Sequence, residues 1–148
     1  CVVEVKAQVP GFDFNRFIDH ESFCINVQSK FLPNDDRALL LKFAGTVEAG
    51  TVAEYGDDGI TQKATVKTGI ASKGDAVVPN PVTLKPFRTF VEVEQPSSQF
   101  VFRMQGNSCV QCALYEADGG AWKLEAMKAI KAYLEAELKD IPGFVVIC

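Results

Sequence analysis

The sequence predicts a mainly β protein, an antiparallel β-sandwich with one C-terminal α-helix. Apolar and polar residues alternate with a period of two over much of the first hundred or so residues, as in strands with one buried face. Turn-forming residues interrupt these stretches about every ten positions, which is typical of sandwiches and barrels. Near the C-terminus the apolar spacing changes to three or four, which is the spacing of an amphipathic helix.

Size and composition favour one folded domain comprising residues 1–148. The 148 residues are 47% hydrophobic and 23% charged, so the chain has enough apolar surface to offset its ordering entropy. A net charge of −4 argues against nucleic-acid binding. The longest apolar runs fall far short of the ~18 residues of a membrane-spanning helix, so we expect no membrane insertion. Because the chain begins at Cys1 without a signal-peptide pattern, we expect a piece of a longer chain.

The N-terminal third is predicted to contain three strands. Alternation over Val3–Ala7 and Phe23–Gln28 predicts two half-buried strands. The apolar run Ala38–Phe43 follows the turn-forming cluster Pro33–Asp36 and predicts a third. We therefore expect a hairpin between about residues 23 and 43.

The middle of the chain is predicted to be β-structure as well. Strands are predicted over Thr46–Tyr55 and Thr61–Ile70, the second closed by a turn at Ser72–Asp75. Prolines at positions 79, 81 and 86 restrict the next segment to an edge strand or an extended connection.

A second hairpin is predicted downstream. Phe90–Glu94 and Phe100–Gln105 both alternate, and the loop between them contains Pro96. Ser108–Tyr115 is predicted to continue as a further strand.

The C-terminal segment is predicted to be a helix followed by a short strand. Residues from Ala121 to Asp140 carry an apolar residue every three or four positions, and Pro142 and Gly143 end the helix. Such an apolar stripe usually covers the core of its own domain, although it can bind a partner. Phe144–Ile147 is expected to be a last buried strand.

Five cysteines suggest an oxidising compartment. Two disulfides among five cysteines allow about fifteen arrangements, since any one cysteine can be left out. We expect the disulfides among Cys24, Cys109, Cys112 and Cys148, with Cys1 left over, and buried free thiols are the alternative. Cys109 and Cys112 form a CxxC motif, which makes a thiol oxidoreductase a further hypothesis, but a strand lacks the helix N-terminus that activates such thiols. Zinc is not expected, because no second CxxC or histidine pair completes the site.

No catalytic residue, metal site or cofactor is predicted, so we expect a protein that is not an enzyme. His20, the only histidine, has no nucleophile marked for it. The segment of residues 11–18 carries Phe12, Phe14 and Phe17. These rings either cover the core or form an exposed patch that anchors a protein partner.

Two stretches resemble galectin carbohydrate-recognition domains. Phe23–Gln28 followed by Asp36–Phe43 is similar to the family pattern F-x-I-N-[FL]-Q … D-I-A-L-H-F, and Phe90–Glu94 followed by Phe100–Gly106 is similar to F-x-[FV]-x-V-N-G. The resemblance implies a galectin-like, jelly-roll sandwich of two antiparallel sheets.

The sugar-binding residues of that family are absent. Galectins bind galactosides through His, Asn and Arg spaced two apart on one strand, where this chain has Lys42, Ala44 and Thr46. The family's stacking Trp precedes the second hairpin, whereas Trp122 follows it. Carbohydrate binding is therefore not expected, and a lectin of altered specificity is the alternative.

A galectin-like domain with cysteines and without a sugar site resembles the C-terminal domain of a micronemal adhesin from apicomplexan parasites. The resemblance implies a protein-binding module of a secreted cell-adhesion complex. It would dock on an EGF-like, cysteine-rich domain of a membrane-anchored partner and assist its folding and transport. It also implies a location in the secretory pathway, in an organelle such as the microneme.

Overall fold

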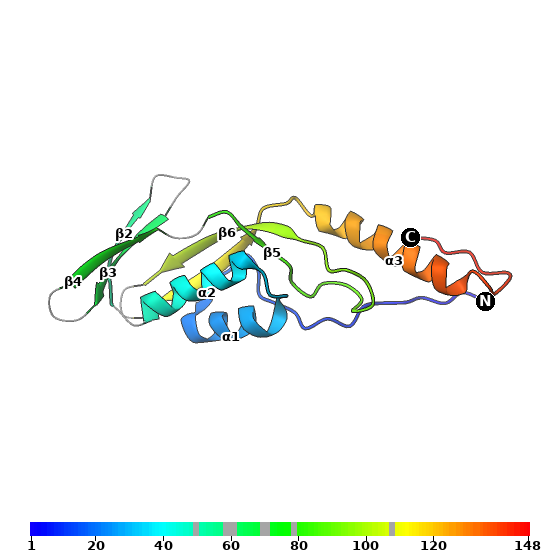
Figure 1. Cartoon of the computed structure of the whole chain (residues 1–148), viewed down its shortest axis with the longest axis horizontal. Helices are drawn as coiled ribbons and strands as arrows, with labels where there is room; N and C mark the ends of the chain where they lie inside the picture. The colour runs from blue at the N-terminus through cyan, green and yellow to red at the C-terminus, as the bar shows by residue number, and fades with distance from the viewer. Residues whose placement is uncertain (49–50, 58–61, 69–71, 78–79, 107–108) are drawn as a thin grey trace.

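In its described residues the protein is a mixed α/β structure with antiparallel sheets and three helices, rather than the mainly β sandwich that the sequence predicts (Figure 1). The computed structural model describes residues 1–48, 51–57, 62–68, 72–77, 80–106 and 109–148. One sheet has the order β1-β7-β6-β5, and the other has the order β2-β3-β4. The helices are α1 (His20–Lys30), α2 (Asp35–Glu48) and α3 (Ala121–Leu138). The strands are β1 (Ile18–Asp19), β2 (Thr51–Asp57), β3 (Gln62–Thr68), β4 (Ser72–Val77), β5 (Val82–Leu84), β6 (Ser98–Gln105) and β7 (Gln111–Glu116).

Helix α1 occupies the segment in which we predicted a strand over Phe23–Gln28, so that prediction is wrong. Asp19 caps the helix, because its carboxylate accepts a hydrogen bond of 2.9 Å from the backbone N–H of Ser22. Phe23 and Val27 are fully buried, whereas Ile25 between them is 57% exposed. The two buried residues are four positions apart and therefore share one helix face. The same positions also fit an alternation with a period of two, which is why a strand was predicted.

Helix α2 replaces the second predicted strand of that hairpin, Ala38–Phe43. Asn34, which we assigned to a hairpin turn, caps the helix: its Oδ1 accepts a hydrogen bond of 2.8 Å from the backbone N–H of Arg37. Asp35 and Asp36 follow in the first turn, where negative charge stabilises the positive end of the helix dipole. The residues that favour a reversal also start helices, because both structures need side chains that bond the local backbone.

The core lies between these two helices and the four-stranded sheet (Figure 1). Helix α1 packs against β7, and α2 packs against β5. The largest fully buried side chains come from both layers: Phe23, Phe31, Leu40, Leu84, Phe100, Phe102 and Leu114. The rings of Phe23 and Phe102 lie 5.5 Å apart between their centroids, so aromatic packing joins helix to sheet.

Gln62, at the start of β3, is bound to the larger sheet. Its side-chain Nε2 donates to the carbonyl oxygen of Met104, and its Oε1 accepts from the backbone N–H of Met104, both at 2.9 Å. Gln62 is only 5% exposed. The amide of Gln62 therefore forms hydrogen bonds with both the backbone N–H and the carbonyl group of Met104 in β6, as a neighbouring strand would.

Several strand predictions hold and others do not. Strands β2, β3, β6 and β7 lie within or overlap predicted strands, and β5 is an edge strand as its flanking prolines predict. The strand predicted over Thr46–Tyr55 is wrong at residues 46–48, which belong to α2. Ser72–Asp75 belongs to strand β4 and not to a turn, and Phe90–Glu94 contains a turn and no strand. Val3–Ala7 and Phe144–Ile147 are not strands either and are largely exposed, and none of the described strands pairs with them. Positions 49, 50, 61, 69, 70 and 108 of the predicted strands lie outside the described residues.

Helix α3 confirms the predicted C-terminal helix. It extends away from the larger sheet, and both chain termini lie beside it, at the end of the molecule opposite the β2-β3-β4 sheet (Figure 1). A search of the described helices found no segment with the length and apolar character needed to cross a membrane.

Candidate functional site

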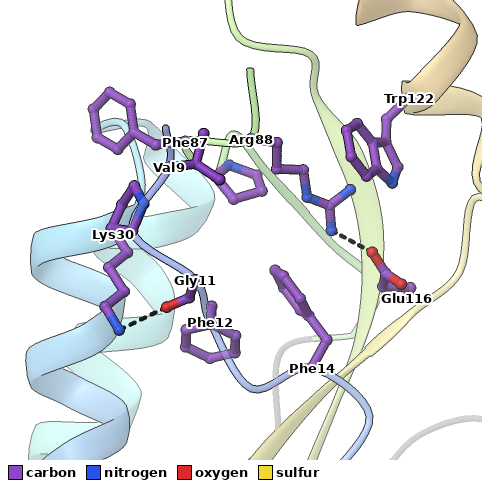
Figure 2. Close-up of a pocket in the computed structure, with 11 residues that line it drawn as sticks. Val9, Gly11, Phe12, Phe14, Lys30, Phe87, Arg88, Glu116 and Trp122 are labelled. Atoms are coloured by element: carbon purple, nitrogen blue, oxygen red, sulfur yellow. Dashed lines mark hydrogen bonds and ion pairs between the residues drawn. The ribbon is translucent and has the colours of Figure 1, made fainter. Parts of the chain in front are cut away.

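An open cavity of about 200 Å³ lies where the N-terminal segment, the loop before β6 and the start of α3 meet (Figure 2). We call it the arginine cavity. Its lining is mostly apolar and includes Val9, Pro10, Phe12, Phe14, Pro86, Phe87 and Trp122. Lys30, Arg88 and Glu116 supply its charged groups. A mostly apolar cavity with a few polar groups is the usual form of a binding site.

Phe12 and Phe14 form a wall of the cavity that is anchored in the core. The ring of Phe14 stacks on that of Phe100, with centroids 5.3 Å apart and an interplanar angle of 12°. The ring of Phe12 contacts that of Phe31 edge-on at 5.1 Å. Both rings are half-buried, so the packing that holds this wall also restricts its movement.

Arg88 is enclosed by aromatic rings. Its side chain is only 5% exposed, and its guanidinium carbon lies 4.7 Å from the ring centre of Phe14, 5.2 Å from that of Phe100 and 4.5 Å from that of Trp122. The negative faces of such rings attract a cation that has lost water. Nη2 also donates to Oε1 of Glu116 at 2.5 Å, which gives the buried charge its partner.

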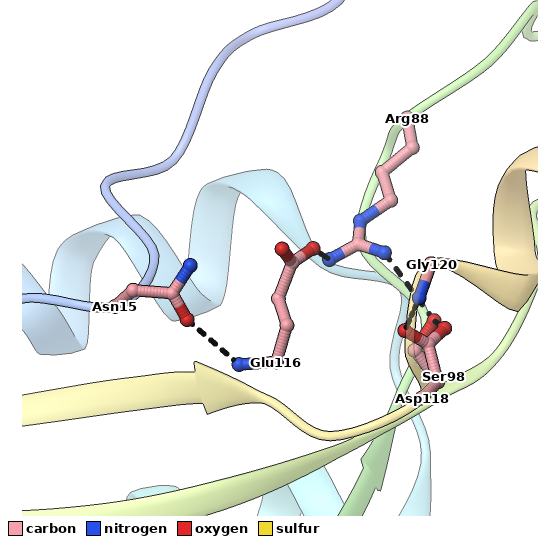
Figure 3. A network of polar contacts seen from close by, with 6 residues as sticks. All are labelled: Asn15, Arg88, Ser98, Glu116, Asp118 and Gly120. Carbon is pink, nitrogen blue, oxygen red and sulfur yellow. Dashed lines mark hydrogen bonds and ion pairs between the residues drawn. The ribbon is translucent and has the colours of Figure 1, made fainter.

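A polar network extends from Arg88 to the start of α3 (Figure 3). Nη1 of Arg88 donates to Oγ of Ser98 at 3.3 Å, and that hydroxyl donates to Asp118 at 2.7 Å. Asp118 in turn accepts a hydrogen bond of 3.0 Å from the backbone N–H of Gly120. Gly120 precedes α3 in the left-handed conformation, with a φ of 82°, which favours glycine. The network therefore attaches α3 to the sheet.

The network also determines the charge state of Asp118. Partial burial acts to raise the pKa of this carboxyl, but hydrogen bonds from Ser98 and from the backbone N–H groups of Gly120 and Trp122, together with the charge of Arg88, outweigh it. The pKa therefore lies below the ordinary value of 3.8. Burial lowers the pKa of Arg88, opposed by the charges of Glu116 and Asp118, and arginine stays protonated in proteins.

The backbone that carries Arg88 is held by the side chain of Gln95. Oε1 of Gln95 accepts from the backbone N–H groups of Arg88 and Thr89 at 2.8 and 3.1 Å. Its Nε2 donates to the carbonyl oxygen of Phe90 at 3.0 Å. Gln95 is 4% exposed, so this loop is fixed by one buried amide that uses both its donor and its acceptor.

Of the three predicted anchor residues, the structure brings two together. Phe12 and Phe14 line the arginine cavity, whereas the ring of Phe17 packs edge-on against Tyr115, 6.2 Å away. Phe14 cannot serve as a simple probe of partner binding, because a charge introduced there would also disrupt its stacking on Phe100.

Lys42, Ala44 and Thr46 do not share a strand face, which corrects their predicted placement along one strand. All three belong to α2, where Ala44 is fully buried while Lys42 and Thr46 are exposed. Positions two apart on a helix point in nearly opposite directions. The row of side chains that binds sugars in the resembled family is therefore not formed.

None of the five cysteines, including the disulfide candidates Cys24, Cys109, Cys112 and Cys148, forms a disulfide in the structure. Burial, with a smaller effect of Cys24, raises the pKa of Cys112 to about 12, which disfavours the thiolate that redox chemistry needs. His20 lies nearby, with its Nε2 3.8 Å from the Sγ of Cys24. No group of three or more metal-binding side chains was found among the described residues.

Sequence reasoning missed the residues at the centre of the cavity. Glu116 and Trp122 lie 28 and 34 residues after Arg88 along the chain. No local sequence pattern connects Arg88 to either of them. The available signal was the single tryptophan, a residue enriched at interfaces, which follows the Asp-Gly-Gly sequence at positions 118–120.

Comparison with known proteins adds no family to this description. No protein-family model matches the chain, and neither the search of curated proteins nor the search of solved structures found a match.

Proposed function

We propose that the chain is a non-catalytic protein-binding module that takes a large apolar side chain of its partner into the arginine cavity. The observation that carries the proposal is this cavity of about 200 Å³, which is open to solvent and lined mainly by aromatic, proline and valine side chains. Pockets of this kind receive the anchor residues that dominate protein–protein affinity. Its wall is already packed into the core through Phe14, so little order has to be gained on binding.

The charged side chains at the cavity indicate which charged group the partner should carry. Arg88 is paired with Glu116 and does not need an anion from outside. Lys30 lies at the rim, where its ammonium group donates one hydrogen bond, 2.7 Å long, to the carbonyl oxygen of Gly11. An ammonium group carries three donors. We therefore expect a peptide in which a carboxylate lies next to the apolar anchor.

A displayed library of random peptides tests the proposal directly. Panning on the full chain is expected to enrich peptides with an aromatic or large aliphatic residue next to Asp or Glu. Val9 is 42% exposed, so Val9→Glu is expected to leave the fold intact. It should weaken peptide binding about tenfold or more, because an apolar anchor in the cavity would take water from the introduced charge.

The matched control is Val3→Glu, which places the same charge on the same N-terminal segment. Val3 is 70% exposed and does not line the cavity, whereas Val9 does. Peptide binding to Val3→Glu should equal that of the unmodified chain. Enriched peptides that bind both variants equally well, or a library that yields no consensus, would refute the proposal.

The narrower expectation of docking on an EGF-like domain in a secreted adhesion complex stays a prediction. Neither hairpin of the galectin resemblance is formed, because Phe23–Gln28 and Asp36–Phe43 are helical and Phe90–Glu94 contains a turn and no strand. A purified EGF-like domain added as competitor to the selected peptides tests it, and displacement of the peptides is the expected result.

A further inference from the structure

We infer that two copies of this chain associate through antiparallel pairing of helix α3. The helix carries an apolar face whose first two turns are exposed. Leu124 is 55% exposed and Met127 is 44% exposed, and the half-buried Leu134 and Leu138 continue the same face about two and three turns beyond Met127. Lys131 lies on the same face, four residues after Met127 and three before Leu134. Its long apolar stem can lie along such a face.

No described helix or strand packs extensively against α3. The helix is attached to the body mainly at its first turn, where Trp122 lies on Arg88. Beyond that point it is flanked by the two terminal segments (Figure 1). Those segments are themselves apolar and exposed, with Val5 at 54% and Phe144 at 58%. The surface that needs a partner therefore includes one side of the helix and its neighbours.

The charges of α3 are arranged against its own dipole. Residues 121–131 carry three lysines and one glutamate, whereas residues 132–138 carry two glutamates and no lysine. Within residues 121–138 the first turn has no acidic residue and the last turn has no basic one, whereas an isolated helix prefers the opposite arrangement. Just outside these bounds, Asp118 accepts hydrogen bonds from the backbone N–H groups of Gly120 and Trp122, and Lys139 is the C-cap residue. The ion pair of Lys131 with Glu135, 3.9 Å apart, stabilises the helix locally, but the division of its other charges into a basic and an acidic half does not.

A second copy in antiparallel orientation does account for it. The basic half of one helix then lies beside the acidic half of the other, twice by symmetry, and the two dipoles oppose each other. Parallel pairing would place like charges together, which is unfavourable. The charge pattern thus specifies both the occupant of the apolar face and its direction.

The exposed area of the chain is sufficient for such an interface. It exposes 9303 Å², whereas a compact monomer of its mass, 16.2 kDa, exposes about 7,500 Å². A standard interface removes about 800 Å² from each partner. The excess therefore exceeds what one copy has to bury in a stable dimer.

The association is tested by sedimentation equilibrium of the full chain under reducing conditions, which exclude disulfides between the exposed cysteines. We expect the mass of a dimer. Leu124→Glu is expected to weaken dimerisation by about tenfold or more, since the charge enters both sides of a two-fold interface. Ile25→Glu, on an exposed and equally apolar position of α1, is the matched control and should leave the dimer intact. A monomer at all concentrations, or a dimer that tolerates Leu124→Glu, overturns the inference.

Charge exchange tests the direction of pairing. Lys128→Glu with Lys131→Glu should weaken the dimer, because both halves of the helix become acidic. Adding Glu135→Lys and Glu137→Lys to that variant exchanges the two halves and should restore association, with circular dichroism confirming the helix in each protein. A photo-crosslinking residue at position 124 should label the partner copy near Leu138. Labelling near the partner's own position 124 would indicate parallel pairing and refute the antiparallel arrangement.

Discussion

Arg88 illustrates how one residue connects three parts of the molecule. Its guanidinium lies among rings from the N-terminal segment, β6 and α3, and it pairs with a carboxylate at the end of β7. A charge buried to this degree is stabilised only when both its hydrogen bonds and its counter-charge are present. Arg88 is therefore structural support for the cavity and not a free cation within it.

Replacing Arg88 with methionine is expected to lower the free energy of unfolding by about 2 kcal/mol, because Glu116 loses its partner and the rings lose the cation. Urea denaturation measures the change. Adding Glu116→Gln should recover part of the loss, since the unpaired carboxylate is removed as well.

Arg16→Met is the matched control for this substitution. Arg16 is 66% exposed and lies 3.7 Å from Asp13, and exposed ion pairs contribute ~0–1 kcal/mol. A loss at Arg16 equal to that at Arg88 would contradict the structural role assigned to Arg88.

Ionisation of Asp118 makes the stability of the fold depend on pH, and the direction of the dependence follows from its pKa. Its pKa is lower in the folded chain than the ordinary value of 3.8, so its ionised form contributes stability that is complete above pH 3.8 and is lost as the pH falls through the lower folded value. Thermal melting of the unmodified chain and of Asp118→Asn should therefore differ most near neutral pH and converge in stronger acid. A difference that grows on acidification would be inconsistent with the network of Figure 3.

At the level of elements, the contacts of α1 and α2 explain why helices form where strands were predicted. The alternation of Phe23, Ile25 and Val27 fits a strand, but the same sequence also places Phe23 and Val27 on one helix face. Burial of both against the sheet, together with the caps at Asp19 and Asn34, favours the helix. Short apolar segments are compatible with either period, so the surrounding sheet decides between them.

Two substitutions of Asn34 can distinguish the contribution of its helix cap from that of its contact with Thr83. Asn34 caps α2 through Oδ1 and donates through Nδ2 to the carbonyl oxygen of Thr83 at 2.9 Å. Asn34→Ala should cost about 1 kcal/mol or more in unfolding free energy, measured by chemical denaturation. Asn34→Asp keeps the cap and loses only the donor to Thr83, so it should cost less. Equal losses would show that the cap contributes nothing.

At the level of the whole molecule, the cavity and α3 depend on the same attachment. Trp122 lines the cavity, contacts Arg88 and lies in the first turn of α3. The proposed peptide site and the proposed dimer face are nevertheless distinct, since the former is tested at Val9 and the latter at Leu124. Peptide binding and dimer mass can therefore succeed or fail independently.

Some features of the fold depend on local spacing and covalent constraint and could be predicted from the residues alone. These are helix α3, whose stripe extends over five turns, the edge position of β5 between prolines, and strands such as β6 whose alternation has no helical counterpart. Tertiary structure alone decided the helical state of α1 and α2 and the meeting of Phe14, Arg88, Glu116 and Trp122. The physical reason is that burial and charge pairing act between residues distant in sequence, whereas propensity and periodicity report only on neighbours.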